Sequence, residues 1–192
     1  MPDPNPAALD FLLTRRSRPA KTLTRPVPDR AALEPILAAA LRSPDHGKLE
    51  PWRLVVLESA ALIRLSQLIP DRGLALGRPP EEIDKQVAQY ASADLAVAVV
   101  VCPVASPKVP EVEQTLSAGA VCLQLLNAAL AAGWGANWLT GWASHDPTFA
   151  REGLGLAEGE WIAGLVHIGT EGAAPPERPR PNPAAKVRWI SA

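Results

Sequence analysis

A stretch without Asp, Glu, Lys or Arg, Gln114–His145, constrains the fold of this chain more than any other feature. Its first part belongs to an apolar helix that is expected over Glu111–Ala132 and to end at Gly133, and such a helix must be covered by protein or by lipid. A membrane-spanning helix needs about 20 predominantly apolar residues. Here small and polar residues interrupt the run: Ser117, Gly119, Gln124 and Asn127. The sequence therefore favours a helix buried in a protein core and partly covered by a second subunit.

Buried strands alternate with helical segments along the rest of the chain. The runs Leu95–Cys102 and Trp161–Gly169 are apolar without alternation, which is typical of strands covered on both faces. Arg53–Glu58 and Gly135–Leu139 are expected to add two further strands. These patterns predict a sheet of about four strands in an α/β or α+β fold. Further helices are expected at Ala7–Arg16, Asp29–Arg42, Ser59–Leu68, Glu81–Ala91 and Asp146–Arg151.

Length and composition indicate a single domain over residues 1–192. The chain is 47% hydrophobic and 20% charged, and it is long enough to bury a core without disulfides. The stretch Pro70–Pro80 contains Gly, Pro and charged residues and is expected to be irregular. Five prolines follow residue 171, at positions 175, 176, 179, 181 and 183. Residues 171–192 are therefore predicted to form an extended tail without a helix or a central strand.

Charge and the sparse cysteines and histidines argue against several classes of protein. A net charge of −1 and a pI of about 6.3 argue against a nucleic-acid partner and against polybasic contact with a membrane surface. Cys102 and Cys122 form no C-x-x-C pair and the three histidines form no H-E-x-x-H motif, so no metal site is expected. The polar, proline-rich first residues do not have the pattern of a secretory signal, so we expect a cytoplasmic protein.

Common catalytic loops are not found in the sequence. The segment Gly133–Trp138 begins like a dinucleotide-binding G-x-G-x-x-G loop, but its sixth position is Trp. It also lies between a helix and a strand in the reverse of the order that this motif requires. The sequence has no Walker A loop, and no G-x-S-x-G turn supports a nucleophilic serine.

Two polar clusters are candidates for binding. Arg15-Arg16-Ser17, at the end of the first helix, either complements the helix dipole or clamps a phosphate. The loop that leads to Trp52 is either a surface loop with a buried Trp anchor or a ligand-binding loop. In the second case it would present Arg42, His46 and Lys48.

Tryptophans form a third candidate. Trp134, Trp138 and Trp142 lie four residues apart, but the glycines among them disfavour a single helix face. They are either core aromatics or a flat wall beside a planar ligand. The segment Gly135–Trp142 is mainly apolar with a few polar groups, which suits a cofactor pocket.

These motifs occur in this order in the nitroreductase family, which the sequence resembles over about residues 7–170. The similarity to its compact YdjA-type branch rests on Arg15-Arg16-Ser17, on the Pro44-Asp45-His46 and Pro51-Trp52 motifs, and on Ser117-Ala118-Gly119 in the long helix. The resemblance implies an α+β, three-layer fold with a mostly antiparallel sheet of four to five strands flanked by helices. It also implies a homodimer that binds FMN at the subunit interface.

The resemblance assigns residues to FMN from both subunits. Arg15, Arg16 and Ser17 match positions on the phosphate and ribityl side, and Trp138, Leu139 and Thr140 match the segment beside the flavin. Arg42 and His46 match positions that reach FMN from the partner chain. Leu139 stands where relatives can carry Arg.

Two further assignments follow from the resemblance. The end of the long helix is associated with the nicotinamide cofactor in this branch, and its residues here are Ala128, Ala129, Leu130, Ala131, Ala132 and Gly133. Because these residues form a helix interior, changes there are expected to affect folding more than nicotinamide binding. Lys186 and Arg188 resemble basic C-terminal residues that reach the phosphate in longer relatives.

The implied activity is that of an FMN-dependent oxidoreductase. NADPH or NADH would reduce the flavin, and a nitroaromatic, a quinone or a similar flat acceptor would then be reduced in the same pocket by a ping-pong mechanism. The cofactor carries this chemistry, in keeping with a sequence that offers no catalytic acid–base pair. The alternatives are an FMN-binding module without turnover, or dehalogenation or flavin cleavage on the same fold.

Overall fold

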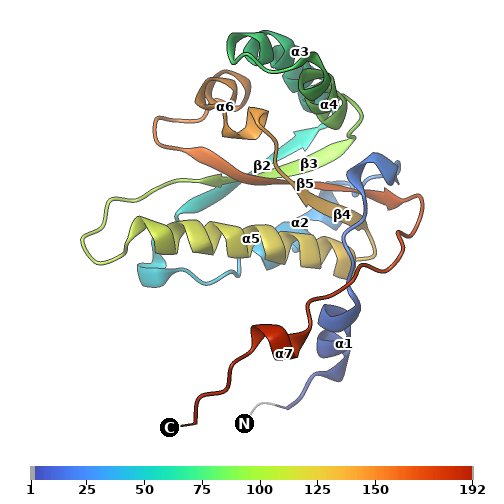
Figure 1. Cartoon of the computed structure of the whole chain (residues 1–192), viewed down its shortest axis with the longest axis vertical. Coiled ribbons are helices and arrows are strands. Elements are labelled where there is room, and N and C mark those ends of the chain that lie inside the picture. The colour runs from blue at the N-terminus through green and yellow to red at the C-terminus, as the bar shows by residue number, and fades with distance from the viewer. Residues whose placement is uncertain (1–2, 192) are drawn as a thin grey trace.

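A five-stranded antiparallel sheet lies between two layers of helices in the computed structural model, which describes residues 3–191 (Figure 1). Strands β1, β5, β3 and β2 follow one another across the sheet, and β4 also pairs with β5. The strands are β1 (Leu23–Thr24), β2 (Trp52–Glu58), β3 (Leu95–Val101), β4 (Gly135–Leu139) and β5 (Trp161–Glu171). The α+β, mostly antiparallel fold that the sequence predicted is confirmed.

The helices lie on both faces of the sheet, with α3, α4 and α6 on one side and α2 and α5 on the other (Figure 1). Their bounds are α1 (Pro6–Thr14), α2 (Arg30–Ala40), α3 (Ser59–Ala75), α4 (Pro80–Ala91), α5 (Glu111–Ala131), α6 (Pro147–Leu154) and α7 (Pro183–Lys186). Asp29 caps α2, because its side chain accepts a hydrogen bond from the backbone N–H of Ala32 at 2.8 Å, as the sequence predicted.

Two hydrophobic cores fill the space between the layers, and every residue of β3 is buried between them. Helix α5 is long and apolar enough to cross a membrane, but it packs against the sheet and buries eight of its residues there. The prediction of a core helix is confirmed for the inner face of α5, and the cover expected from a second subunit on the other face stays a prediction. Its outer face exposes Val112 and Leu116, which are 63% and 68% accessible.

The chain departs from the sequence-based expectations at two proline-containing segments. Helix α3 was expected to end at Leu68 but continues through Pro70 to Ala75. Ile69 and Gly73 are buried against α4, where Gly73 leaves no room for a side chain beside Ile83. This packing outweighs the hydrogen bond that proline removes. In the tail, Pro183 occupies the first position of the short helix α7, where proline is tolerated, so the prediction of a tail without helix is wrong for this turn.

Both ends of the described chain project together from the body of the molecule (Figure 1). Helix α1 has no buried residue, and Leu13 on it is 73% exposed. At the other end Trp189 is 91% exposed and Ile190 75% exposed. Clusters of exposed apolar side chains mark interaction surfaces, so this pair of segments has the composition of an arm that contacts another surface.

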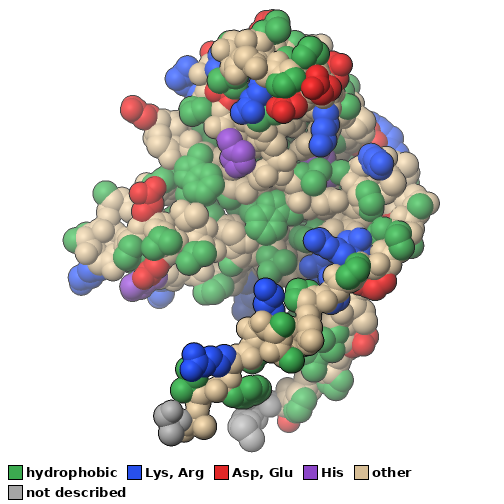
Figure 2. All heavy atoms as spheres, viewed as in Figure 1, with side chains coloured by type: hydrophobic (Ala, Val, Ile, Leu, Met, Phe, Trp, Pro, Cys, Tyr) green, Lys and Arg blue, Asp and Glu red, His purple; other side chains and the backbone are tan. Residues whose placement is uncertain are grey.

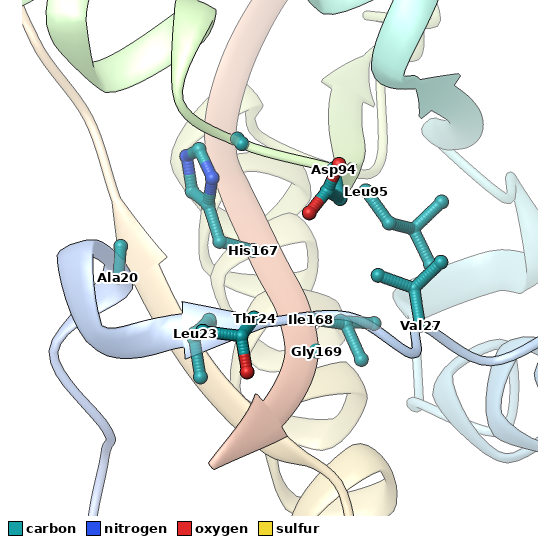
Figure 3. Close-up of a pocket in the computed structure, with 10 residues that line it drawn as sticks. Ala20, Leu23, Thr24, Val27, Asp94, Leu95, His167, Ile168 and Gly169 are labelled. Carbon is teal, nitrogen blue, oxygen red and sulfur yellow. The ribbon is translucent and has the colours of Figure 1, made fainter. Parts of the chain in front are cut away.

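His167 is a buried titratable group in β5. It is 2% exposed, and it lies beside a cavity of about 10 Å³ whose wall includes Ala20, Thr24 and Asp94 (Figure 3). Asp94 is itself held by Arg25, whose Nε donates to its carboxylate at 2.8 Å. Burial lowers the pKa of His167 from 6.5 to about 4. The imidazole is therefore neutral in the folded protein at neutral pH.

This burial predicts a loss of stability in mild acid. Below pH 6.5 the unfolded chain protonates His167 while the folded chain does not until about pH 4, so the free energy of unfolding falls as the pH drops through this window. We expect a loss of about 2 kcal/mol between about pH 7.5 and 5. Denaturant titrations should show this loss in the wild type and in His145→Gln, which changes an exposed histidine, but not in His167→Gln. An equal loss in His167→Gln would contradict the assignment.

Candidate functional site

The segment that follows α1 is fastened to the outer edge of β4. The backbone N–H of Arg18 donates to the carbonyl of Ala136 at 2.8 Å, and Asn137 Nδ2 donates to the carbonyl of Arg18 at 2.7 Å. These bonds bring Arg15-Arg16-Ser17 to the same edge of the sheet as Trp138-Leu139-Thr140. Two of the predicted groups of site residues, more than 100 positions apart in the sequence, thus belong to one region.

Arg15, Arg16 and Ser17 form a half-buried cationic group with free donors. Helix α1 ends at Thr14, so the three residues follow the helix rather than forming its last turn. Arg15 Nη2 donates to Ser17 Oγ at 3.2 Å, whereas the Nε atoms of Arg15 and Arg16 are buried without a partner among the described residues. Burial lowers the pKa of Arg15, and the nearby charges of Arg180 and Arg16 lower it further. Such a group is electrostatically suited to an anion.

The C-terminal tail adds a further arginine to this group. Arg180 Nη2 donates to the carbonyl of Arg15 at 3.4 Å, and its Nε donates to Glu177 at 2.9 Å. Figure 2 shows Lys and Arg side chains gathered where the chain leaves the sheet toward the tail. Lys186 and Arg188, which the resemblance singled out, lie on the exposed outer part of the tail. The sequence did not indicate Arg180, because only the folded tail brings it to Arg15.

Of the three tryptophans, only Trp138 remains a candidate for a flat binding surface. Trp134 and Trp142 are half-buried and pack against the two hydrophobic cores, as the core alternative expects. Trp138 is 37% exposed, and its Cδ1 lies 2.5 Å from the position that a Cβ would take at Gly164. The indole therefore lies against the backbone of β5, which only glycine permits there. Leu139 beside it is half-buried, and Thr140 is exposed.

Arg42 and His46 lie in a different region, near the start of α5. His46 Nδ1 is 2.6 Å from Glu113 Oε2 in the first turn of that helix. Trp52 is 9% exposed, and its Nε1 donates to Ser117 Oγ at 2.9 Å, so it is the buried anchor of the loop. Arg42 itself is exposed.

Helix α5 separates these two regions within one chain. His46 contacts Glu113 near its start, whereas Ala136, which holds Arg18, follows its end. Ala131 lies 18 positions after Glu113, so the helix spans about 27 Å between them at about 1.5 Å per residue. A single chain thus does not bring Arg42 and His46 to the group formed by Arg15, Arg16 and Ser17.

The proposed nicotinamide segment lies at the C-terminal end of α5. Ala129 is fully buried in the core, Ala128 and Leu130 are half-buried, and Ala131, Ala132 and Gly133 are exposed. Among the described residues there is no group of three or more His, Cys, Asp or Glu side chains placed to bind a metal ion.

Comparison with known proteins places this arrangement in a family. The model of the nitroreductase family matches residues 12–170. The chain is 35% identical over 163 residues to YdjA of Escherichia coli strain K12, which is assigned by name to the NAD(P)H nitroreductases, and the match covers 85% of this chain and 87% of that protein.

Solved structures agree on the fold. A nitroreductase-like protein from Bacillus cereus superimposes with a TM-score of 0.75 at 23% identity over all of both chains. A nitroreductase-type protein from Desulfovibrio desulfuricans, solved in complex with FMN, gives 0.74 at 19% identity over 99% of this chain and all of the other. The sequence motifs, the sheet with its two helical layers and the match over residues 12–170 together show that this chain belongs to the nitroreductase family.

Proposed function

We propose that this protein is an FMN-dependent NAD(P)H oxidoreductase that reduces nitroaromatic, quinone or similar flat acceptors. The observation that carries the proposal is the pair of guanidinium Nε atoms of Arg15 and Arg16, which are buried without a partner among residues 3–191, at the same sheet edge as the partly open indole of Trp138. A ligand that joins a phosphate to a planar ring system satisfies both features. FMN is such a ligand.

The relatives support this proposal. The name of the Escherichia coli relative points to NAD(P)H as reductant, and the Desulfovibrio desulfuricans structure contains FMN. FMN, when bound, supplies hydride and electron transfer that side chains cannot perform. In this chain Arg15, Arg16 and Ser17 would bind its phosphate, and Trp138, Leu139 and Thr140 would lie along the ring. Leu139 offers no charged contact there.

We also propose that a second copy of the chain completes the site. Arg42 and His46 lie about one helix length from the arginine group, so they would contact the FMN held mainly by the partner. The exposed apolar faces of α1 and α5 and the apolar end of the tail are the surfaces that a homodimer would cover. A cytoplasmic location stays a prediction.

The loop between α3 and α4 argues against the other FMN chemistries. Dehalogenation and flavin cleavage on this fold generally come with an inserted lid over the flavin. Here α3 runs to Ala75 and α4 begins at Pro80, so only a short turn separates two packed helices. A flavin without such a lid suits an enzyme that accepts donor and acceptor in turn.

Arg16→Ala should weaken FMN binding about tenfold or more, because a charge-assisted hydrogen bond contributes about 1.5–3 kcal/mol. Fluorescence titration of the flavin-free protein measures this affinity. Arg30→Ala is the matched control, since Arg30 is an exposed arginine paired with Glu34 at 3.3 Å on α2. Equal affinities for the two variants would remove Arg16 from the phosphate site.

Steady-state kinetics should give parallel double-reciprocal lines for NAD(P)H and the acceptor, because one pocket serves both. Intersecting lines would mean that both substrates bind together, and would support a separate nicotinamide site at Ala128–Gly133.

Anaerobic mixing with NADPH or NADH separates an enzyme from a binding module. We expect loss of the flavin absorbance, whereas an unreduced flavin would leave only the binding function.

A further inference from the structure

Gln86, on helix α4, packs directly against the residue that follows the proposed flavin-binding segment. It is a polar side chain that is only 4% exposed. Its Oε1 is the atom nearest to the position that a Cβ would take at Gly141, and its Cδ and Nε2 lie 2.7 and 2.8 Å from that position. No side chain larger than hydrogen fits at 141 unless Gln86 moves, so the carboxamide lies directly against the backbone that follows Thr140.

The carboxamide of Gln86 also retains an unused donor. Its Nε2 is buried and has no hydrogen-bond acceptor among residues 3–191. Leaving a buried N–H unpaired destabilises a protein, and leucine would fill a similar volume without this cost. The unpaired donor of Gln86 differs from other unpaired donors in its position, because the carboxamide lies against Gly141, directly after the candidate flavin-binding segment.

A second contact from α4 holds the next residue of the same segment. Trp142 Nε1 donates to the backbone carbonyl of Glu82 at 3.4 Å, and the guanidinium of Arg78 lies 5.8 Å from the centre of the Trp142 ring. Upstream, the bonds of Arg18 fix Ala136 and Asn137. Trp138, Leu139 and Thr140 are therefore held from both ends, and α4 controls the downstream end.

We propose that Gln86 is a positioning residue for the flavin site. Its carboxamide packs on Gly141 and sets the orientation of Trp138-Leu139-Thr140, and its free N–H donates to a carbonyl oxygen of this segment once FMN is bound. This inference rests on the proposed FMN function and adds to it a residue that does not itself touch the flavin. Gly141 is then required because the carboxamide of Gln86 occupies the space that a larger side chain would need.

The test is FMN affinity and thermal stability measured on the same purified variants. Gln86→Leu should lower FMN affinity about tenfold while the flavin-free protein keeps its melting temperature or gains a little. Gly141→Ala should lower the affinity at least as much, because the new methyl group displaces the carboxamide. The double variant Gly141→Ala/Gln86→Ala should bind FMN as well as Gln86→Ala alone, since the space is then free.

Two controls separate positioning from general destabilisation. Gln89→Leu changes another glutamine of α4 whose Nε2 is buried and unpartnered among the described residues, but which is not among the nearest contacts of Gly141. Gly153→Ala creates a comparable clash in α6, where a Cβ would lie 2.5 Å from Leu65. We expect Gly153→Ala to lower the melting temperature, and both controls to keep the wild-type FMN affinity.

The outcomes distinguish the two proposals. Wild-type protein that binds no FMN would overturn the proposed function, and the positioning role of Gln86 with it. Wild-type binding together with unchanged affinity in Gln86→Leu and Gly141→Ala would overturn the positioning role alone. The positioning role is also overturned if the double variant binds FMN more weakly than Gln86→Ala, or if the variants lose only thermal stability.

Discussion

The packing of helix α5 against the sheet determines where every candidate site residue lies. One face of the helix is buried with β3, β4 and β5 in the first hydrophobic core, which includes Val121, Leu125 and Ala129. Its start holds the loop that carries His46, through Glu113 and Ser117. Its end leads directly into β4, the strand to which the arginine segment is fastened. The helix thus sets both halves of the proposed site and the distance between them.

The other face of α5 is a surface that the proposed dimer would cover. Val112, Leu116 and Leu123 remain exposed on a helix with only two charged residues, both in its first turn. Exposed apolar residues also occur on α1 and at the end of the tail, and the cost of leaving them in water favours association. A second copy that covers these surfaces also provides a way to bring Arg42 and His46 to the arginine group.

Local patterns predicted most of the fold, and long-range contacts account for what they missed. The uniform apolar run over Leu95–Val101 correctly predicted β3, because a strand buried on both faces needs apolar side chains throughout. Gly133 correctly predicted the end of α5, because the chain there adopts a positive φ that favours glycine. The continuation of α3 through Pro70 depends on packing against α4. The contact of Gln86 with Gly141 and the approach of Arg180 to Arg15 join distant positions, and neither has a local signal.

The most direct measurement asks whether one FMN site uses residues from two chains. Chains carrying Arg16→Ala and chains carrying Arg42→Ala/His46→Ala are co-expressed with different affinity tags, and the mixed dimer is purified. One site then receives all the substitutions and the other receives none, so the account predicts that the mixed dimer binds about half of the wild-type FMN with wild-type affinity. Each parent homodimer should bind poorly. A folded mixed dimer that binds FMN no better than its parents would contradict the shared site.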